Sequence, residues 1–381
     1  MATLLLEIPQ SARTLLKREA FENTILQFAQ YVRWLKSNKC SCQKDDIGRP
    51  DPNCQYCSGK GFYYTFPSDL RIYNEQAYVS GDRELTVDYS TIKEILSVRR
   101  KINGNWYSLD VDSFSGTKIN INECEDFRKY YPFYVDYIFD PYIEFETTGT
   151  YQGEGNILVS NIETILNRGG TVIPDIISVE SVKSGSQSYT VNSFSRNIVN
   201  IEYSGLNIPS TLTVKGKYIN SWLFGVMNIQ TKQRYESAYV AQDGDANIVV
   251  PNFITAGERD VFTLTMAEDT RMEILGRGAG DKDELPSFDV SRIVKIIEIT
   301  ATGIKVYEQY KDYILWERNK IKWLTDNQPV KLYSVEYLYH PSFVVIPQVP
   351  SIRYPQNDRF PRKLVVKYLD KSTKDNYEVV Q

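Results

Sequence analysis

Four of the five cysteines in this chain lie close together, and they constrain what it can fold into more than any other feature. They form two pairs, Cys40 with Cys42 and Cys54 with Cys57, and the loop between the pairs is dense in Asp, Gly and Pro. Such turn-forming residues allow a loop to return to its origin. Two close cysteine pairs joined by a loop are typical of a tetrahedral zinc site. We therefore predict that Cys40, Cys42, Cys54 and Cys57 bind a structural Zn²⁺ ion in a small knuckle.

Other roles for these thiols fit the sequence less well. A redox-active Cys54/Cys57 pair would need a βαβ context, which the glycine-rich and aromatic residues downstream do not predict. Disulfides are disfavoured because no signal peptide precedes them and a reducing compartment is expected. A catalytic zinc needs an open coordination position, which four thiolates do not leave. The fifth cysteine, Cys124, is distant in sequence and is expected to be an ordinary buried or half-buried thiol.

Length and composition limit the remaining possibilities. A chain of 381 residues can bury a sizeable core and is expected to divide into about two to four units. The 28 tyrosines, together with abundant Val, Ile and Thr, favour β strands. A net charge of -4 argues against a dedicated nucleic-acid-binding protein. Without a signal peptide or an apolar stretch long enough to cross a bilayer, a soluble protein made in a cytoplasm is expected.

The residues before the knuckle show helical spacing of apolar side chains. Ser11 could cap a helix from about Ala12 to Lys36, with Leu15, Phe21 and Ile25 on its apolar side. This predicted amphipathic helix would lead directly into the knuckle with no strand between them. It would pack either on a β core or on a neighbouring subunit.

Three later segments repeat one order of features. Each begins with a strand rich in Ile and Val, continues through a glycine turn, a polar-plus-aromatic step, a short alternating strand and a proline-marked loop, and ends on an alternating strand. The opening strands are predicted at 92–98, 176–182 and 293–299, and the closing strands at 134–139, 212–218 and 333–339. In the closing strands Val135, Val214 and Val335 are predicted to share one face with Tyr137 and Tyr337, because residues two apart in a strand point the same way.

The predicted fold is therefore mainly β, with repeated small antiparallel β-sandwich or barrel-like modules, an N-terminal helix and a zinc knuckle. Residues 146–172 are rich in glycine and are predicted to form mainly a loop. Within 221–285, two hairpins are predicted, one from 238–241 with 248–250 and one from 261–266 with 271–275. The expected units are the helix (1–38), the knuckle (39–66), three β modules (67–147, 148–220 and 286–381) and a hairpin insertion or linker (221–285).

No arrangement of residues typical of a catalytic site is recognisable. The single histidine, His340, lies at the end of a predicted strand and has no evident nucleophile or orienting partner, so a turn residue is expected. The stretch 276–282 is rich in glycine but lacks the spacing and the Ser/Thr of a phosphate-binding loop, so a hairpin tip or linker is preferred. We therefore predict that the chain is not an enzyme.

The cysteine stretch resembles the zinc knuckle of virion proteins from the neck and tail of tailed bacteriophages. The similar residues are Cys40-x-Cys42 followed by Gly48-Arg49-Pro50-x-Pro52-Asn53-Cys54-x-x-Cys57-x-Gly59-x-Gly61. Those proteins commonly carry a C-P-C variant, and Ser41 replaces that proline here. A second similar stretch comprises Tyr339-His340-Pro341, Arg353-Tyr354 and Phe360-Pro361-Arg362-Lys363. The unit C-x-x-C-x-G-x-G also resembles one arm of the DnaJ zinc domain, which repeats it, whereas this chain has it once.

The phage resemblance implies a structural virion component, which we expect to be a neck (head-to-tail connector) protein that assembles as a homo-oligomeric ring. Its expected partners are connector, tail or baseplate subunits, with incidental DNA contact and no membrane. Its expected location is the virion, after synthesis in the host cytoplasm. Three alternatives remain open: a tail or baseplate structural protein, a zinc-knuckle nucleic-acid-binding or chaperone-like adaptor, and an unrecognised glycan-active enzyme.

Overall fold

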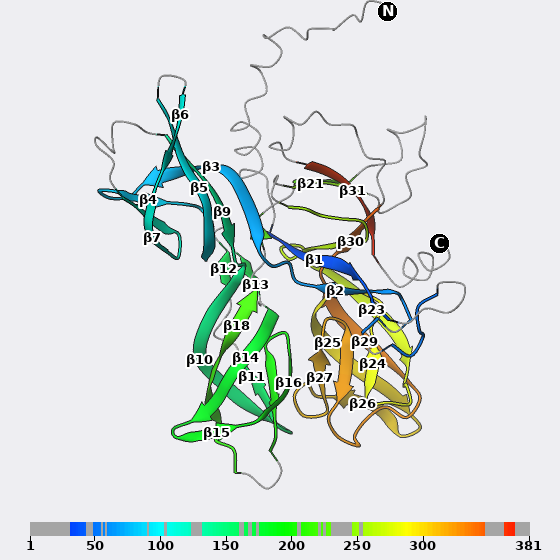
Figure 1. The fold of residues 1–381 in the computed structure, drawn as a ribbon. Helices are drawn as coiled ribbons and strands as arrows, with labels where there is room; N and C mark the ends of the chain where they lie inside the picture. The colour runs from blue at the N-terminus through cyan, green and yellow to red at the C-terminus, as the bar shows by residue number, and fades with distance from the viewer. Residues whose placement is uncertain are drawn as a thin grey trace, which may run out of the picture.

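A computed structural model of the chain gives the arrangement shown in Figure 1. It describes residues 31–42, 49–54, 56–57, 59–89, 91–102, 105–122, 132–159, 164–166, 170–172, 175–203, 207–219, 222–223, 226–229, 246–250, 254–346 and 362–369. All regular structure in these ranges is β strand, so the mainly β prediction is confirmed for them. The same ranges contain no helix long and apolar enough to span a bilayer.

One sheet collects strands from distant parts of the sequence, and we call it the composite sheet. Its order is β19-β1-β22-β30-β31-β21-β20, and β2 pairs additionally with β1. The strands are β1 (Tyr31–Lys39), β2 (Phe62–Thr65), β19 (Trp222–Leu223), β20 (Val226–Ile229), β21 (Ala246–Val250), β22 (Val261–Leu264), β30 (Ser342–Val345) and β31 (Arg362–Tyr368). Both ends of the described chain therefore meet in one sheet, from which the other sheets extend (Figure 1).

The predicted N-terminal helix is not supported. Its last residues, Tyr31 to Lys36, belong to β1, which pairs with β22 over Val32–Leu35 and with β2 over Lys36–Lys39. A strand therefore leads into the knuckle, contrary to the prediction. Residues 1–30 of the predicted helix lie outside the described residues. The misprediction has a physical cause: residues 32–35 are all buried, so β1 lacks the alternation of a half-exposed strand.

Module 1 is a seven-stranded antiparallel sheet with the order β6-β5-β9-β3-β4-β8-β7. Its first and last strands are neighbours, and Leu70 lies opposite Phe139 where the chain enters and leaves the module. Its strands are β3 (Leu70–Val79), β4 (Glu84–Thr86), β5 (Ile92–Ile102), β6 (Asn105–Leu109), β7 (Val111–Ser115), β8 (Lys118–Ile121) and β9 (Phe133–Phe139).

Module 2 has the order β15-β14-β18-β10-β11-β17-β16, and Tyr142 lies opposite Ile219 at its entry and exit. A small hairpin of β12 (Thr164–Leu166) and β13 (Gly170–Val172) lies between β11 and β14 in sequence. The seven strands of the sheet are β10 (Tyr142–Gly153), β11 (Asn156–Leu158), β14 (Asp175–Ser184), β15 (Gln187–Tyr189), β16 (Val191–Ser195), β17 (Ile198–Ile201) and β18 (Thr211–Ile219).

Module 3 divides the same set of strands into two sheets, β26-β25-β29-β23 and β24-β28-β27. Asp269 lies opposite Tyr339 at its entry and exit. Its strands are β23 (Asp269–Gly276), β24 (Lys282–Glu284), β25 (Val290–Thr300), β26 (Gly303–Tyr307), β27 (Tyr313–Trp316), β28 (Lys320–Trp323) and β29 (Leu332–Tyr339).

The three modules share one topology. Numbering the seven strands of each module in chain order, every module reads 4-3-7-1-2-6-5, with a break between strands 1 and 2 in module 3. The third strand of each carries two bulges three residues apart. They start at Ile92 and Ile95 in module 1, at Ile176 and Val179 in module 2, and at Val290 and Ile293 in module 3. Because bulges alter twist and register locally, their recurrence at matching places shows that the modules are repeats in structure.

The predicted face of the closing strands is confirmed. Val135, Val214 and Val335 are fully buried, as are Tyr137 and Tyr337. In module 2 the position of these tyrosines is taken by Gly216. A side chain does not fit there, because a Cβ would lie 2.2 Å from the carbonyl oxygen of Ser178.

The sequence did not assign the first two strands of any module to that module, although the strand predicted at 271–275 lies within β23. Residues 142–153 and 156–158 form β10 and β11, so much of the predicted 146–172 loop is strand. The predicted hairpin of 261–266 with 271–275 is wrong, because β22 pairs with β1 and β30 whereas β23 pairs with β29. Residues 238–241 of the other predicted hairpin lie outside the described residues, and β21 pairs with β20 and β31. Strands β23 and β24 lie within the segment 221–285 yet belong to module 3.

Packing joins the modules to the composite sheet. One buried apolar cluster includes side chains of module 1 and of the composite sheet, among them Trp34, Phe133 and Phe262. Separate clusters fill modules 2 and 3. Ile198 of module 2 packs with Ile314 and Trp316 of module 3. The knuckle is therefore attached to a sheet that contacts the rest of the described molecule.

Candidate metal centre

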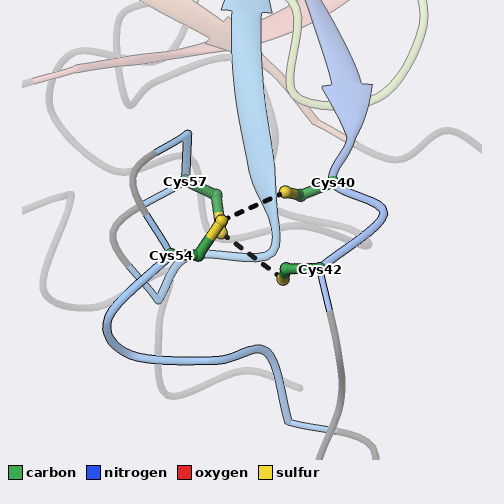
Figure 2. A group of neighbouring side chains, drawn as sticks. All are labelled: Cys40, Cys42, Cys54 and Cys57. Atoms are coloured by element: carbon green, nitrogen blue, oxygen red, sulfur yellow. Dashed lines mark hydrogen bonds between the residues drawn. The ribbon is translucent and has the colours of Figure 1, made fainter.

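The four predicted cysteines come together in the structure. Cys40 and Cys42 follow the end of β1, and Cys54 and Cys57 lie on the loop before β2 (Figure 2). Their sulfur atoms all lie within 4.8 Å of one another. Cys40 Sγ is 3.6 Å from Cys54 Sγ, and Cys42 Sγ is 3.7 Å from Cys57 Sγ. None of the four is in a disulfide, so the cluster could hold a metal ion.

The backbone on both sides of the cluster holds the cysteines in place. The amide of Cys40 donates to the carbonyl of Gly61 at 2.8 Å, which continues the pairing of β1 with β2 to the first ligand. The amide of Lys60 donates to the carbonyl of Cys57 at 2.9 Å and closes a tight turn. Gly59 in this turn has φ +81°, and a Cβ on it would lie 3.1 Å from Cα of Pro52. Glycine is therefore required both for the turn and for the close approach of the loop.

Two of the sulfur–sulfur separations match those around a tetrahedral ion. With metal–sulfur bonds of about 2.3 Å, two ligands of a tetrahedral zinc are separated by about 3.8 Å. The 3.6 Å and 3.7 Å separations are close to that value. A bonded disulfide would instead need about 2.05 Å between sulfurs. The donor set is all sulfur, which selects soft or borderline ions over Ca²⁺ and Mg²⁺.

The local environment changes the acidity of the thiols in opposite directions. The Cys42 amide lowers the pKa of Cys40, but desolvation and hydrogen bonds with the neighbouring thiols outweigh it and raise that pKa to about 12. Desolvation raises the pKa of Cys57, but the Gly61 amide and the other thiols stabilise its thiolate and lower that pKa to about 7. Because metal ligands must be deprotonated, an ion that binds here releases protons as it enters.

A cleft of about 770 Å³ lies beside the cluster, between the knuckle, β2 and module 3. Cys57 and the exposed Tyr56 contribute to its wall from the knuckle, and Phe288 and Lys320 do so from module 3. The cysteine cluster therefore borders a cavity that two separate parts of the chain form.

A buried ionic cluster connects the same parts of the molecule. Arg33 of β1 lies 2.8 Å from Asp175 of module 2 through Nε and 2.5 Å from Asp289 of module 3 through Nη1. Arg318 is 2.7 Å from Asp289 and 3.3 Å from Asp175. Arg196 donates to the carbonyl of Val290. Burial favours the neutral acid, but the three guanidinium groups outweigh it and hold the pKa of Asp289 well below its usual range.

The sequence did not identify these charged residues as a group. They come from five separate segments, and Arg33 was placed on the predicted helix. The only signal in the sequence was Arg33 itself, a charged residue among apolar neighbours. Such a residue is buried only with partners for its charge.

The remaining sequence candidates have structural roles. His340 follows β29 directly, as predicted, and is buried with Nδ1 2.9 Å from the carbonyl of Ala267. Residues 277–281 connect β23 to β24, and the amide of Gly278 donates to Oδ1 of Asp283 at 2.7 Å. The carboxylate therefore accepts the hydrogen bond that a phosphate would need from this amide. Cys124 lies outside the described residues.

Comparison with known proteins finds no family model that matches the chain, and no curated protein that is significantly similar to it. Its class therefore follows from the fold and the site alone. It is a β-sheet protein built from three repeated seven-stranded modules on a composite sheet. More particularly, it carries a four-cysteine cluster, able to hold a metal ion, on a knuckle at the end of β1.

Proposed function

We propose that the chain is a structural component of a tailed-bacteriophage virion, located at the neck, where copies assemble as a ring between head and tail. The observation that carries this proposal is the four-cysteine cluster. The segment whose residues resemble the knuckle of neck and tail proteins folds so that all four sulfurs converge within 4.8 Å. The three modules are a further support, because a protein of repeated β units offers many faces to neighbours in an assembly.

In this proposal the bound ion is Zn²⁺, and its role is structural. Among the described residues from 49 to 61, only Cys57 is buried, so the knuckle has almost no hydrophobic core. A segment of this kind depends on metal binding for its folded state. Four sulfur ligands complete a tetrahedral shell and leave no position for substrate.

Exposed aromatic side chains support contacts with other proteins. Tyr56 on the knuckle is 81% exposed, and Tyr78, Trp106 and Tyr107 on module 1 are about half exposed. Tyrosine and tryptophan offer a large contact area with a polar tip and are enriched at protein interfaces. We infer that these side chains contact other virion subunits.

The test is to locate the chain in purified particles by labelling it with antibody-bound gold and by cryo-electron microscopy. We expect label and ring-shaped density at the junction of head and tail. Label at the tail tip would replace the neck with a tail or baseplate position. Absence of the chain from washed, infectious particles would overturn the proposal.

The metal is tested separately on reduced, freshly purified protein. Elemental analysis is expected to find one zinc per chain, and the double variant Cys54→Ser/Cys57→Ser is expected to lose it. Purified protein without zinc, under reducing conditions, would contradict the structural zinc whatever the location of the chain.

A further inference from the structure

The outer face of the four-stranded sheet in module 3 is apolar and exposed. This face belongs to β23, β29, β25 and β26, which are hydrogen-bonded to one another in that order. Its exposed fractions range from 54% at Val306 to 80% at Ile299. The most exposed apolar side chains are Met272, Ile274, Ile299, Ile304, Val306 and Leu332. The opposite face of the same sheet is covered, since Ile296, Val335 and Tyr337 on it are buried.

Strand register aligns these side chains in rows across the sheet. One row runs Ile274–Ser334–Ile297–Val306, through the pairings of β23 with β29, of β29 with β25 and of β25 with β26. Ile299 is paired with Ile304 farther along β25 and β26. The face is therefore a continuous apolar surface, not a set of scattered side chains, and such a surface marks an interaction site.

Modules 1 and 2 provide an internal comparison, because their strand order is the same and their strands pair at the corresponding positions of this row. The row that corresponds to Ile274–Ser334–Ile297–Val306 is Thr148–Thr213–Lys183–Ser188 in module 2. In module 1 it is Gln76–Tyr134–Arg99–Ser108. The topology alone does not require apolar residues at these positions. Their presence in module 3 is therefore specific to that module.

The chemistry of the face matches a second copy of the same chain. Its exposed apolar side chains are aliphatic or Met, with no aromatic residue among them. Interfaces between different proteins that associate reversibly are richer in Tyr, Trp and Arg, whereas homodimer interfaces resemble a hydrophobic core divided in two. Two apolar sheet faces also pack well on each other, with their strands nearly aligned.

The charges on the face are complementary to those of a second copy. Lys295 on β25 is opposite Glu336 on β29, in the row next to Ile274. A two-fold axis along the strands, midway between β25 and β29, places β25 of one copy over β29 of the other. Lys295 of each copy then faces Glu336 of its partner, and Ile274 faces Val306. Every row therefore meets its own row, and in the row of Lys295 and Glu336 opposite charges face each other.

The geometry points to a two-fold contact between two copies of this chain, formed by the outer faces of β23, β29, β25 and β26 packed sheet on sheet. This contact uses the same surface on both copies and closes at two. It is distinct from the head-to-tail contacts that would form a ring, and it does not depend on the metal or on a place in a virion.

Sedimentation velocity of the full chain over a concentration series tests this contact. The parent protein is expected to show a concentration-dependent two-fold association. Ile274→Glu is expected to raise its dissociation constant by roughly a hundredfold or more, because the axis places the unpaired carboxylate twice in each interface. The matched control is Thr148→Glu, which adds the same charge at the corresponding exposed position of module 2 and is expected to associate like the parent.

Charge exchange provides a second, independent readout. Lys295→Glu and Glu336→Lys are each expected to weaken the association because like charges then face each other, and the double exchange is expected to restore it. A parent protein that stays monomeric at every concentration would overturn the inference. So would Ile274→Glu or the single exchanges associating like the parent.

Discussion

Arg33 Nη1 donates to Oδ2 of Asp289 across 2.5 Å, between residues that are 256 positions apart in the sequence. Both side chains are almost completely buried, and Asp175 contacts the same guanidinium through its Nε. One arginine of the composite sheet therefore binds carboxylates of modules 2 and 3 together. A buried ion pair of this kind holds the segments that carry it together, because separating them would leave a buried charge without its partner.

Replacing Arg33 with alanine is expected to destabilise the protein by about 3–5 kcal/mol, since it leaves two buried carboxylates with fewer partners. Urea unfolding, followed by tryptophan fluorescence, measures the effect. The matched control is Lys93→Ala, which removes an exposed ion pair with Asp69 and should change the midpoint little. Equal midpoints for the Arg33 variant and the parent would show that the cluster does not hold the modules.

His340 should make stability depend on pH in the acidic range. Burial lowers the pKa of its imidazole below the ordinary value, although Asp289 opposes this change. The unfolded chain therefore takes up a proton first as pH falls below about 6.5, and the free energy of unfolding decreases until the folded pKa is passed. His340→Gln is expected to flatten that part of a plot of unfolding free energy against pH. An unchanged slope would assign the dependence to other groups.

Gly216→Ala is expected to destabilise module 2. The added methyl group would lie 2.2 Å from the carbonyl oxygen of Ser178, so β14 and β18 would have to separate. Overpacking of this kind costs about 1–3 kcal/mol. Gly257→Ala is the control, since a Cβ there meets nothing within 4 Å. Chemical denaturation of the two variants checks the difference, and similar losses would contradict the close approach of the two strands.

Metal removal is expected to unfold the knuckle locally. With a chelator and a reductant present, the amides of Cys40 and Lys60 should lose protection from hydrogen exchange, because their acceptors lie next to the cluster. The amides of β18 in module 2 should keep theirs. Hydrogen exchange read by mass spectrometry distinguishes the two regions. Unchanged protection of the knuckle would show that it folds without an ion.

The cysteine cluster and the closing strands were predictable because their signals are local. The spacing of Cys40, Cys42, Cys54 and Cys57 was enough to predict that they cluster. The alternation of the closing strands was enough to predict which face Val135 and its counterparts share. The sequence aligned Ile293 of the third repeat with Ile92 and Ile176. In the structure the residue that corresponds to them is Val290, where the first bulge of β25 starts.

Non-local pairing explains what the sequence did not reveal. In the composite sheet β1 pairs with β22, more than two hundred residues later, and a local sequence pattern does not specify that pairing. Its residues 32–35 are buried on both faces, so a helical spacing of apolar residues was read where a strand forms. Strand β10 contains Gly149 and Gly153 and was read as a loop, yet its long pairing with β18 makes it the centre of a sheet.

The pairing of first and last strands has a consequence for how this chain can change. Leu70 lies opposite Phe139, Tyr142 opposite Ile219 and Asp269 opposite Tyr339, so each module begins and ends at one point. A unit that the backbone enters and leaves at one place can be deleted and bridged by a short linker without a break in the neighbouring strands. Such a deletion would still remove side-chain contacts made elsewhere, such as those of Arg33 with Asp175 and Asp289.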